Sequence, residues 1–140
     1  MIICGHGHYA TGFKSTMELL AGKNEDIFYV DFTEADTDGT LKEKLLSVVN
    51  ENINEEILFV CDILGGTPFR VAAEIASSSK NMELVAGCNI GGILEASFLK
   101  DSMPLGQLAD EIVEKSKSSI IRFSINEESN DGLFPDDEGI

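Results

Sequence analysis

Four short apolar segments alternate along the chain with stretches of helical spacing, and this alternation constrains the fold more than any other feature. The apolar segments cover residues 2–4, 27–31, 57–61 and 84–86, and polar residues or glycines bound each of them. Such short apolar runs are typical of strands that are buried on both faces of a parallel sheet. A further strand is expected over residues 120–123, near the end of the chain.

Helical spacing fills the intervals between the predicted strands. The apolar positions that repeat every three or four residues are Phe13, Met17 and Leu20, then Leu41, Leu45, Val48, Val49 and Ile53, then Val71, Ala72 and Ile75. Two more helices are expected over 93–99 and 105–116. Strands that alternate with helices are joined by right-handed crossovers. We therefore predict an α/β fold with a doubly wound, mainly parallel sheet of order 2-1-3-4 and helices on both faces.

The length and the charge of the chain limit its domain organisation and its partners. A chain of 140 residues is the size of one domain, which we expect over 1–125, followed by an acidic, loosely ordered tail over 126–140. The formal net charge of -15 argues against nucleic acid as a partner, because phosphates would be repelled, whereas basic proteins would be attracted.

The sequence shows neither a targeting pattern nor a paired cysteine motif. No apolar run approaches the roughly 20 residues of a membrane helix, and the chain start lacks a signal-peptide pattern, so we expect a cytoplasmic protein without membrane insertion. The three cysteines, Cys4, Cys61 and Cys88, lie in or beside apolar runs rather than in paired motifs. They are expected to be buried thiols, without disulfides or zinc.

Two polar motifs follow the first and third predicted strands, whose carboxyl ends flank the switch point of a 2-1-3-4 sheet, where ligands bind in such folds. The first motif is Gly5-His6-Gly7-His8, and the second begins at Asp62. A histidine between glycines suits a tight turn that something approaches closely, and imidazole is a nucleophile near neutral pH. Asp62 either orients His6 through one ring nitrogen or serves as a turn residue that binds backbone amides.

The residues Gly65-Gly66-Thr67-Pro68 have the form of a helix entry, with Thr67 as the N-cap and Pro68 as the first helical residue. Capping alone explains this pattern. Beside His6, however, the helix amides and the Thr67 hydroxyl would form an anion site. The two motifs together predict a phosphohistidine, with His6 and Asp62 as catalytic residues and Gly65, Gly66 and Thr67 as phosphate-binding residues.

Two other chemistries fit these residues less well. His6 and His8 form a His-x-His pair of the kind that binds zinc in some hydrolases, but the chain has no other histidine to complete a site. Neither glycine motif has the spacing of a Walker or dinucleotide-binding loop. We therefore expect neither a metal nor a cofactor, and the metal content of the purified protein would test the hydrolase alternative.

The chain resembles the enzyme IIA components of the mannose family of the bacterial sugar phosphotransferase system. The resemblance covers nearly all of the chain before the tail, so that 1–125 reads as a domain of this type. The residues that carry it are Gly5-His6-Gly7, Asp62-Ile63-Leu64-Gly65-Gly66-Thr67-Pro68-Phe69, Val30-Asp31-Phe32 and Ala86-Gly87-Cys88-Asn89. It implies that His6 is the active-site histidine, Asp62 the orienting aspartate and Thr67 the phosphate-contacting hydroxyl.

The same resemblance implies partners and an oligomeric state. The phosphoryl group would arrive from the phosphocarrier protein HPr and leave to a histidine of the IIB component, and the chain would form a homodimer, often with its last strand exchanged. The sequence departs from the family pattern after Asn89, where Ile90-Gly91-Gly92 replaces a frequent Pro-Met pair. The alternative function is a regulatory or binding domain of the same fold that has lost transfer activity.

Overall fold

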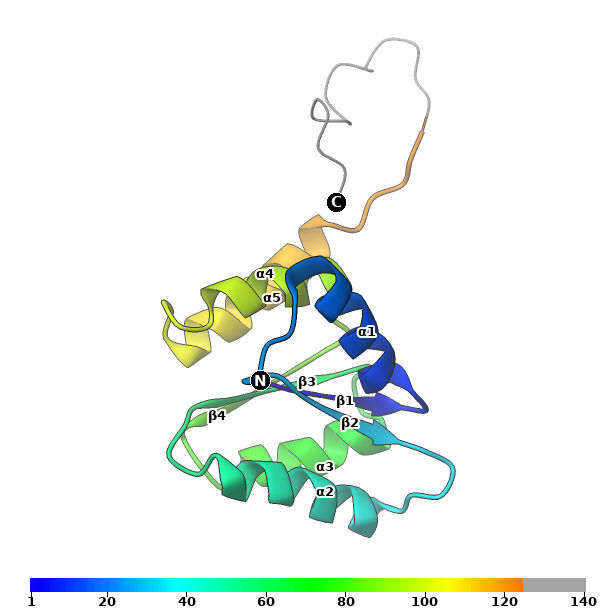
Figure 1. Cartoon of the computed structure of the whole chain (residues 1–140), viewed down its shortest axis with the longest axis vertical. Helices are drawn as coiled ribbons and strands as arrows, with labels where there is room; N and C mark the ends of the chain where they lie inside the picture. Colours follow the sequence, from blue (N-terminus) through cyan, green and yellow to red (C-terminus); the bar gives the residue numbers. More distant parts are fainter. Residues whose placement is uncertain (125–140) are drawn as a thin grey trace.

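Four parallel strands form the centre of the structure, a computed structural model that describes residues 1–124 (Figure 1). The strands are β1 (Ile2–His6), β2 (Phe28–Phe32), β3 (Ile57–Cys61) and β4 (Met82–Ala86). They lie in the order β2-β1-β3-β4, with β1 in register with both neighbours, so that Cys4 pairs with Val30 and with Cys61. This order confirms the predicted doubly wound topology.

Helices cover both faces of this sheet, as predicted (Figure 1). The helices are α1 (Tyr9–Ala21), α2 (Asp38–Glu51), α3 (Thr67–Ala76), α4 (Ile90–Leu99) and α5 (Leu105–Ser118). Successive strand residues face opposite sides of a sheet. Ile3 and Val60 therefore pack with residues of α1, α4 and α5, whereas Cys4 and Phe59 pack with residues of α2 and α3. All three cysteines are buried, as expected.

The helix and strand boundaries differ from the predictions at a few positions. His6 is the last residue of β1 rather than a residue beyond it. Ile53 lies outside α2 and is 71% exposed, so it does not belong to the apolar face of that helix. Helix α4 begins three residues earlier than predicted, because the Asn89 side chain accepts a hydrogen bond from the Gly92 amide and caps it.

The strand predicted over 120–123 is not formed in the single chain. After α5, the chain runs away from the body of the molecule (Figure 1), and Ile120, Ile121 and Phe123 are exposed. A β-rich sequence needs an adjacent strand to pair with, and none lies beside this segment within residues 1–124. The predicted tail over 126–140 lies outside the described residues. No helix between residues 1 and 124 has the length and apolar character needed to cross a membrane.

Candidate active site

The sheet order brings His6 and Asp62 into contact. His6 ends β1, and Asp62 directly follows β3, the adjacent strand. The Nδ1 atom of His6 lies 2.6 Å from Oδ2 of Asp62, and the backbone N–H of His6 donates to the same oxygen at 2.8 Å. The Ile63 amide donates to the other carboxylate oxygen at 2.9 Å. Asp62 thus holds both the ring and the backbone of His6, in addition to capping its own turn.

This contact keeps Asp62 ionised and selects one tautomer of the neutral His6 ring. Burial raises the pKa of the Asp62 carboxyl, but the hydrogen bonds from the amide and ring of His6 and from the Ile63 amide outweigh burial and bring the pKa below its ordinary value. A carboxylate only accepts hydrogen bonds, so in the neutral ring Nδ1 carries the hydrogen and Nε2 carries the lone pair. The His6 side chain is 42% exposed, compared with 12% for Asp62, so the ring can be reached from solvent.

Glycines allow the backbone to approach this pair closely. A Cβ atom on Gly66 would lie 2.7 Å from Cε1 of His6, so the start of α3 lies directly against the ring. A Cβ atom on Gly5 would meet Tyr9 at 2.4 Å and the Asp62 carboxyl carbon at 2.9 Å. Neither position leaves room for a side chain. Gly65 adopts a φ of 79°, in the left-handed region that favours glycine, and so turns the chain into α3.

The predicted cap of α3 is wrong by one residue. Gly66 is the N-cap, Thr67 is the first helical residue, and Pro68 is the second. The hydroxyl of Thr67 makes no capping bond and instead accepts a hydrogen bond from Arg70 Nη2 at 3.2 Å. Pro68 has no N–H, so the amides of Gly66, Thr67 and Phe69 are the donors that the helix geometry leaves without an intrahelical acceptor. This end of α3 lies beside His6 and is suited to an anion.

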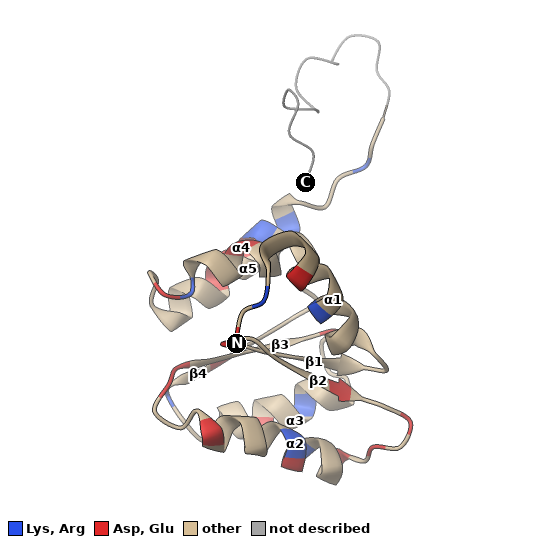
Figure 2. Ribbon diagram, viewed as in Figure 1, with Lys and Arg blue, Asp and Glu red and all other residues tan. Residues whose placement is uncertain are grey.

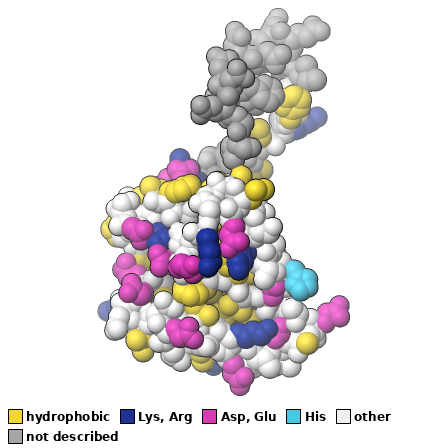
Figure 3. Space-filling model, viewed as in Figure 1, with side chains coloured by type: hydrophobic (Ala, Val, Ile, Leu, Met, Phe, Trp, Pro, Cys, Tyr) yellow, Lys and Arg dark blue, Asp and Glu magenta, His cyan; other side chains and the backbone are white. Residues whose placement is uncertain are grey.

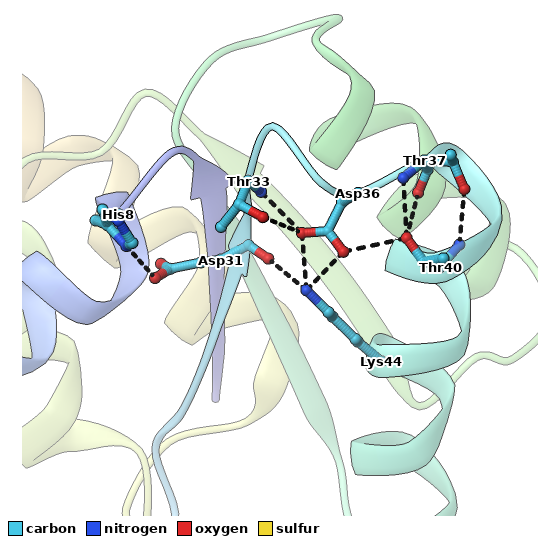
Figure 4. Close-up of polar contacts among 7 residues, drawn as sticks. All are labelled: His8, Asp31, Thr33, Asp36, Thr37, Thr40 and Lys44. Carbon is cyan, nitrogen blue, oxygen red and sulfur yellow. Dashed lines mark hydrogen bonds and ion pairs between the residues drawn. The ribbon is translucent and has the colours of Figure 1, made fainter.

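His8 forms a separate pair with Asp31 at the end of β2 (Figure 4). Its Nδ1 atom lies 3.1 Å from Asp31 Oδ2, and its side chain is 84% exposed. Asp31 also accepts hydrogen bonds from the Thr11 amide at 3.0 Å and from the Thr11 hydroxyl at 2.7 Å. Asp31 therefore caps the first turn of α1 from the neighbouring strand, because His8, the N-cap residue, makes no side-chain cap of its own.

The loop after β2 is held by an ion pair (Figure 4). Lys44 lies 2.7 Å from Asp36, whose pKa is lowered by hydrogen bonds from the Lys44 ammonium and from Thr33.

Phe32, the last residue of β2, packs its ring edgewise against the His6 ring, with centroids 5.7 Å apart. Sequence reasoning missed the contacts of Phe32 and Arg70, since both depend on side-chain packing rather than on a motif.

Between residues 1 and 124, no three His, Cys, Asp or Glu side chains are grouped so that they could hold a metal ion. The polar groups that converge on His6 are instead hydrogen-bond donors at the start of α3 and the Asp62 carboxylate.

Comparison with known proteins identifies the class. Residues 1–113 match the family model described as the fructose IIA component of the phosphotransferase system, and the chain belongs to this family. It is 30% identical over 120 residues to the fructose-specific EIIA component of Bacillus subtilis, which covers 85% of this chain and 82% of that protein. The chain is also 27% identical over 114 residues to the sorbose-specific EIIA component of Lacticaseibacillus casei, covering 81% and 83% of the two chains.

Solved structures agree with this assignment. Component EIIA of Streptococcus agalactiae has a TM-score of 0.78 at 26% identity, over 86% of this chain and 94% of that one. The mannose/sorbose specific IIA subunit of Enterococcus faecalis has a TM-score of 0.82 over 89% of this chain and 94% of that one; at 24% identity it supports the fold alone. The protein is therefore a phosphoryl-transfer component of a sugar phosphotransferase system.

Proposed function

We propose that this chain accepts a phosphoryl group from phosphorylated HPr on Nε2 of His6 and passes it to the IIB component for sugar uptake. The observation that carries the proposal is the hydrogen bond from Nδ1 of His6 to Asp62, which leaves Nε2 as the nucleophilic atom beside the start of α3. Both partners act in the cytosol, where we place this protein.

The proposed transfer needs no other reactant. The Nε2 lone pair attacks the phosphorus atom, and the phosphorus–nitrogen bond of the donor breaks, its electron pair remaining on the donor imidazole. The hydrogen on Nδ1 stays in its bond to Asp62, whose negative charge offsets the positive charge that the phosphorylated ring acquires. In the transfer to IIB, phosphorylated His6 is the donor and the histidine of IIB is the nucleophile, so the bond between phosphorus and Nε2 of His6 breaks.

The start of α3 supplies the donors for the phosphoryl oxygens. The free amides of this helix end and the Thr67 hydroxyl would bind these oxygens as Nε2 takes the group. Positioning and charge stabilisation of this kind account for most of the catalysis in phosphoryl transfer. The helix is held in place by its buried apolar face, which includes Val71, Ala72 and Ile75.

Single-residue variants test which histidine accepts the group. Incubation with phosphorylated HPr should add one acid-labile, base-stable phosphoryl group to the protein. His6→Ala should abolish the modification, whereas His8→Ala should retain it, because His8 contacts Asp31 and not Asp62. Intact-mass measurement and quantitative labelling would give the stoichiometry.

The two variants also define the contrary results. Loss of labelling in His8→Ala with full labelling of His6→Ala would overturn the site while leaving the pathway intact. Failure of every HPr tested, the cognate one included, to label the unmodified protein would favour a regulatory domain without transfer activity.

A further inference from the structure

The positively charged side chain of Arg70 lies in the first turn of α3, three residues after Thr67 on the same helical face. The Nη2 atom of Arg70 donates to Oγ1 of Thr67 at 3.2 Å. The guanidinium also lies 3.9 Å from a carboxylate oxygen of Asp38, the first residue of α2. Both charged side chains are mostly exposed, at 65% and 71%, so this ion pair contributes little and is easily rearranged.

The hydrogen bond from Arg70 determines what the Thr67 hydroxyl can do. A hydroxyl has one hydrogen to donate and two lone pairs to accept with, whereas a guanidinium only donates. Because Oγ1 accepts from Arg70, the hydroxyl hydrogen remains free for an anionic oxygen. Thr67 directly follows Gly66, which lies against the His6 ring. The donor is therefore both oriented and polarised at the position where a phosphoryl group on Nε2 would need it.

The charge around the site makes a polarised Thr67 hydroxyl more important. Asp62 contacts His6, Asp31 lies at the end of the neighbouring strand, and acidic side chains outnumber basic ones along the chain (Figure 2). A phosphoryl group carries further negative charge into this environment. The guanidinium brings positive charge to the Thr67 hydroxyl through their hydrogen bond, and so makes this hydroxyl a stronger donor to an anionic oxygen.

We propose that Arg70 is a positioning residue for the phosphoryl group, which it helps to hold by fixing and polarising the Thr67 hydroxyl. The proposal rests on phosphorylation of His6 and adds a residue that lies directly after the predicted motif, which ends at Phe69. It requires that Arg70 and Thr67 act as one unit, because the arginine works through the hydroxyl.

A double-mutant cycle tests this coupling. The rate constant for labelling by saturating phosphorylated HPr is measured for Arg70→Ala, for Thr67→Ala and for the variant with both changes. Each single change should lower the rate about tenfold, the effect of one charge-assisted hydrogen bond. The double variant should lose no more than either single one, because the same interaction is removed in all three. The concentration of HPr at half saturation should stay unchanged, and Arg70→Lys should recover part of the rate.

Lys42→Ala is the matched control for loss of a positive charge. Lys42 pairs with Glu74 at 2.7 Å, one turn further along α3, and makes no contact with Thr67. It should label at the rate of the unmodified protein, and all variants should melt at similar temperatures. The proposal would be overturned if Arg70→Ala and Lys42→Ala lowered the labelling rate equally, or if the two losses added up in the double variant. It would also be overturned if Arg70→Ala changed only the HPr concentration at half saturation.

Chemical labelling separates this proposal from the identity of the donor. Phosphoramidate phosphorylates histidine without a partner protein, and the ³¹P resonance of the labelled protein reports the surroundings of the group. Arg70→Ala should shift this resonance and shorten the half-life of the phosphohistidine at neutral pH, whereas Lys42→Ala should change neither. Unaltered resonance and half-life in Arg70→Ala would overturn the role of Arg70 even if HPr is not the donor.

Discussion

Asp62 fixes the ring of His6 and the backbone that carries it through one carboxylate oxygen, so the two residues behave as a unit. The arrangement determines which nitrogen is the nucleophile before any donor arrives. It also places a negative charge where the ring would become positive in the proposed phosphorylated state. In the proposed reaction, the neutral and the phosphorylated states of His6 would thus use the same hydrogen bond for different purposes.

Asp62→Asn should separate orientation from charge. The amide oxygen of asparagine can still accept from Nδ1, but its NH2 group would face the Ile63 amide, and the side chain offers no negative charge to a phosphorylated ring. We expect labelling by phosphorylated HPr to slow about 10-fold to 100-fold, the range for a hydrogen bond to a charged group, with a small change in melting temperature. Rapid-quench kinetics and calorimetry on the same samples measure both quantities.

The lowered pKa of Asp62 adds a pH dependence to this prediction. A carboxyl whose pKa is lower in the folded state contributes stability above its unfolded pKa of about 3.9, and this contribution is lost as the pH falls through the folded value. The difference in melting temperature between the unmodified protein and Asp62→Asn should therefore shrink in acid. A large, pH-independent difference would mean that Asp62 is chiefly a structural residue.

Contacts between residues at the ends of neighbouring strands can be predicted from the sequence more readily than contacts between residues on a helix. His6 and Asp62 were expected to meet because parallel strands bring their carboxyl ends to one edge of the sheet. The contact between Arg70 and Thr67 depends on where α3 begins, and the motif placed that boundary one residue too late. Thr67 shares a helical face with Arg70 because α3 begins at Thr67 rather than at Pro68, so this contact needs the structure itself.

At the scale of secondary-structure elements, the departure Ile90-Gly91-Gly92 has a packing explanation. Helix α4 crosses α5 closely at Gly92, where an added Cβ atom would lie 2.1 Å from the Ser116 hydroxyl and 2.8 Å from the Ile112 carbonyl oxygen. The Asn89 side chain joins the same two helices, since it caps α4 and donates to the Ser116 carbonyl at 2.9 Å. The glycine thus sets the distance between the two helices.

Gly92→Ala should accordingly destabilise the protein by about 1 to 3 kcal/mol, because the contact includes backbone atoms of α5 that cannot rotate away. Gly91→Ala is the matched control. A Cβ atom at that position has ordinary contacts of 3.4 Å or more, so the free energy of unfolding should stay the same or rise by up to about 1 kcal/mol. Urea denaturation compares the two variants, and equal stabilities would contradict the close crossing.

Element types were easier to predict than the pairing of the last segment. The alternation of buried strands and helices was confirmed because each element satisfies its own periodicity within one chain. Residues 120–123 have the composition of a strand, but pairing requires an adjacent edge, and the part of the chain that the structure describes places none beside them. The sequence therefore indicates a preference there, and only an assembly could fulfil it.

For the whole molecule, the acidic surface and the exposed apolar side chains after α5 indicate which partners the protein can bind. The net charge of -15 leaves acidic side chains over much of the surface, with basic groups between them and histidine exposed at one side (Figures 2 and 3). An acidic surface around an accessible histidine would steer basic proteins toward it. The exposed apolar side chains after α5 point to another kind of contact, with a second copy of this chain.

We predict a homodimer in which residues 120–123 pair with a second subunit. Ile121 and Phe123 are 69% and 59% exposed, and alternate residues of an extended segment share one face. Strand β4 pairs with β3 alone within residues 1–124, so its other edge is available to the partner. Sedimentation at micromolar concentration should give twice the 15.2 kDa of one chain.

Changing Ile121 and Phe123 together to Asp should give monomers that still accept phosphoryl groups, because His6 and Asp62 belong to one chain. Leu19→Asp, at an even more exposed apolar position on α1, should leave the dimer intact, and a 15.2 kDa species alone in the unmodified protein would refute the assembly.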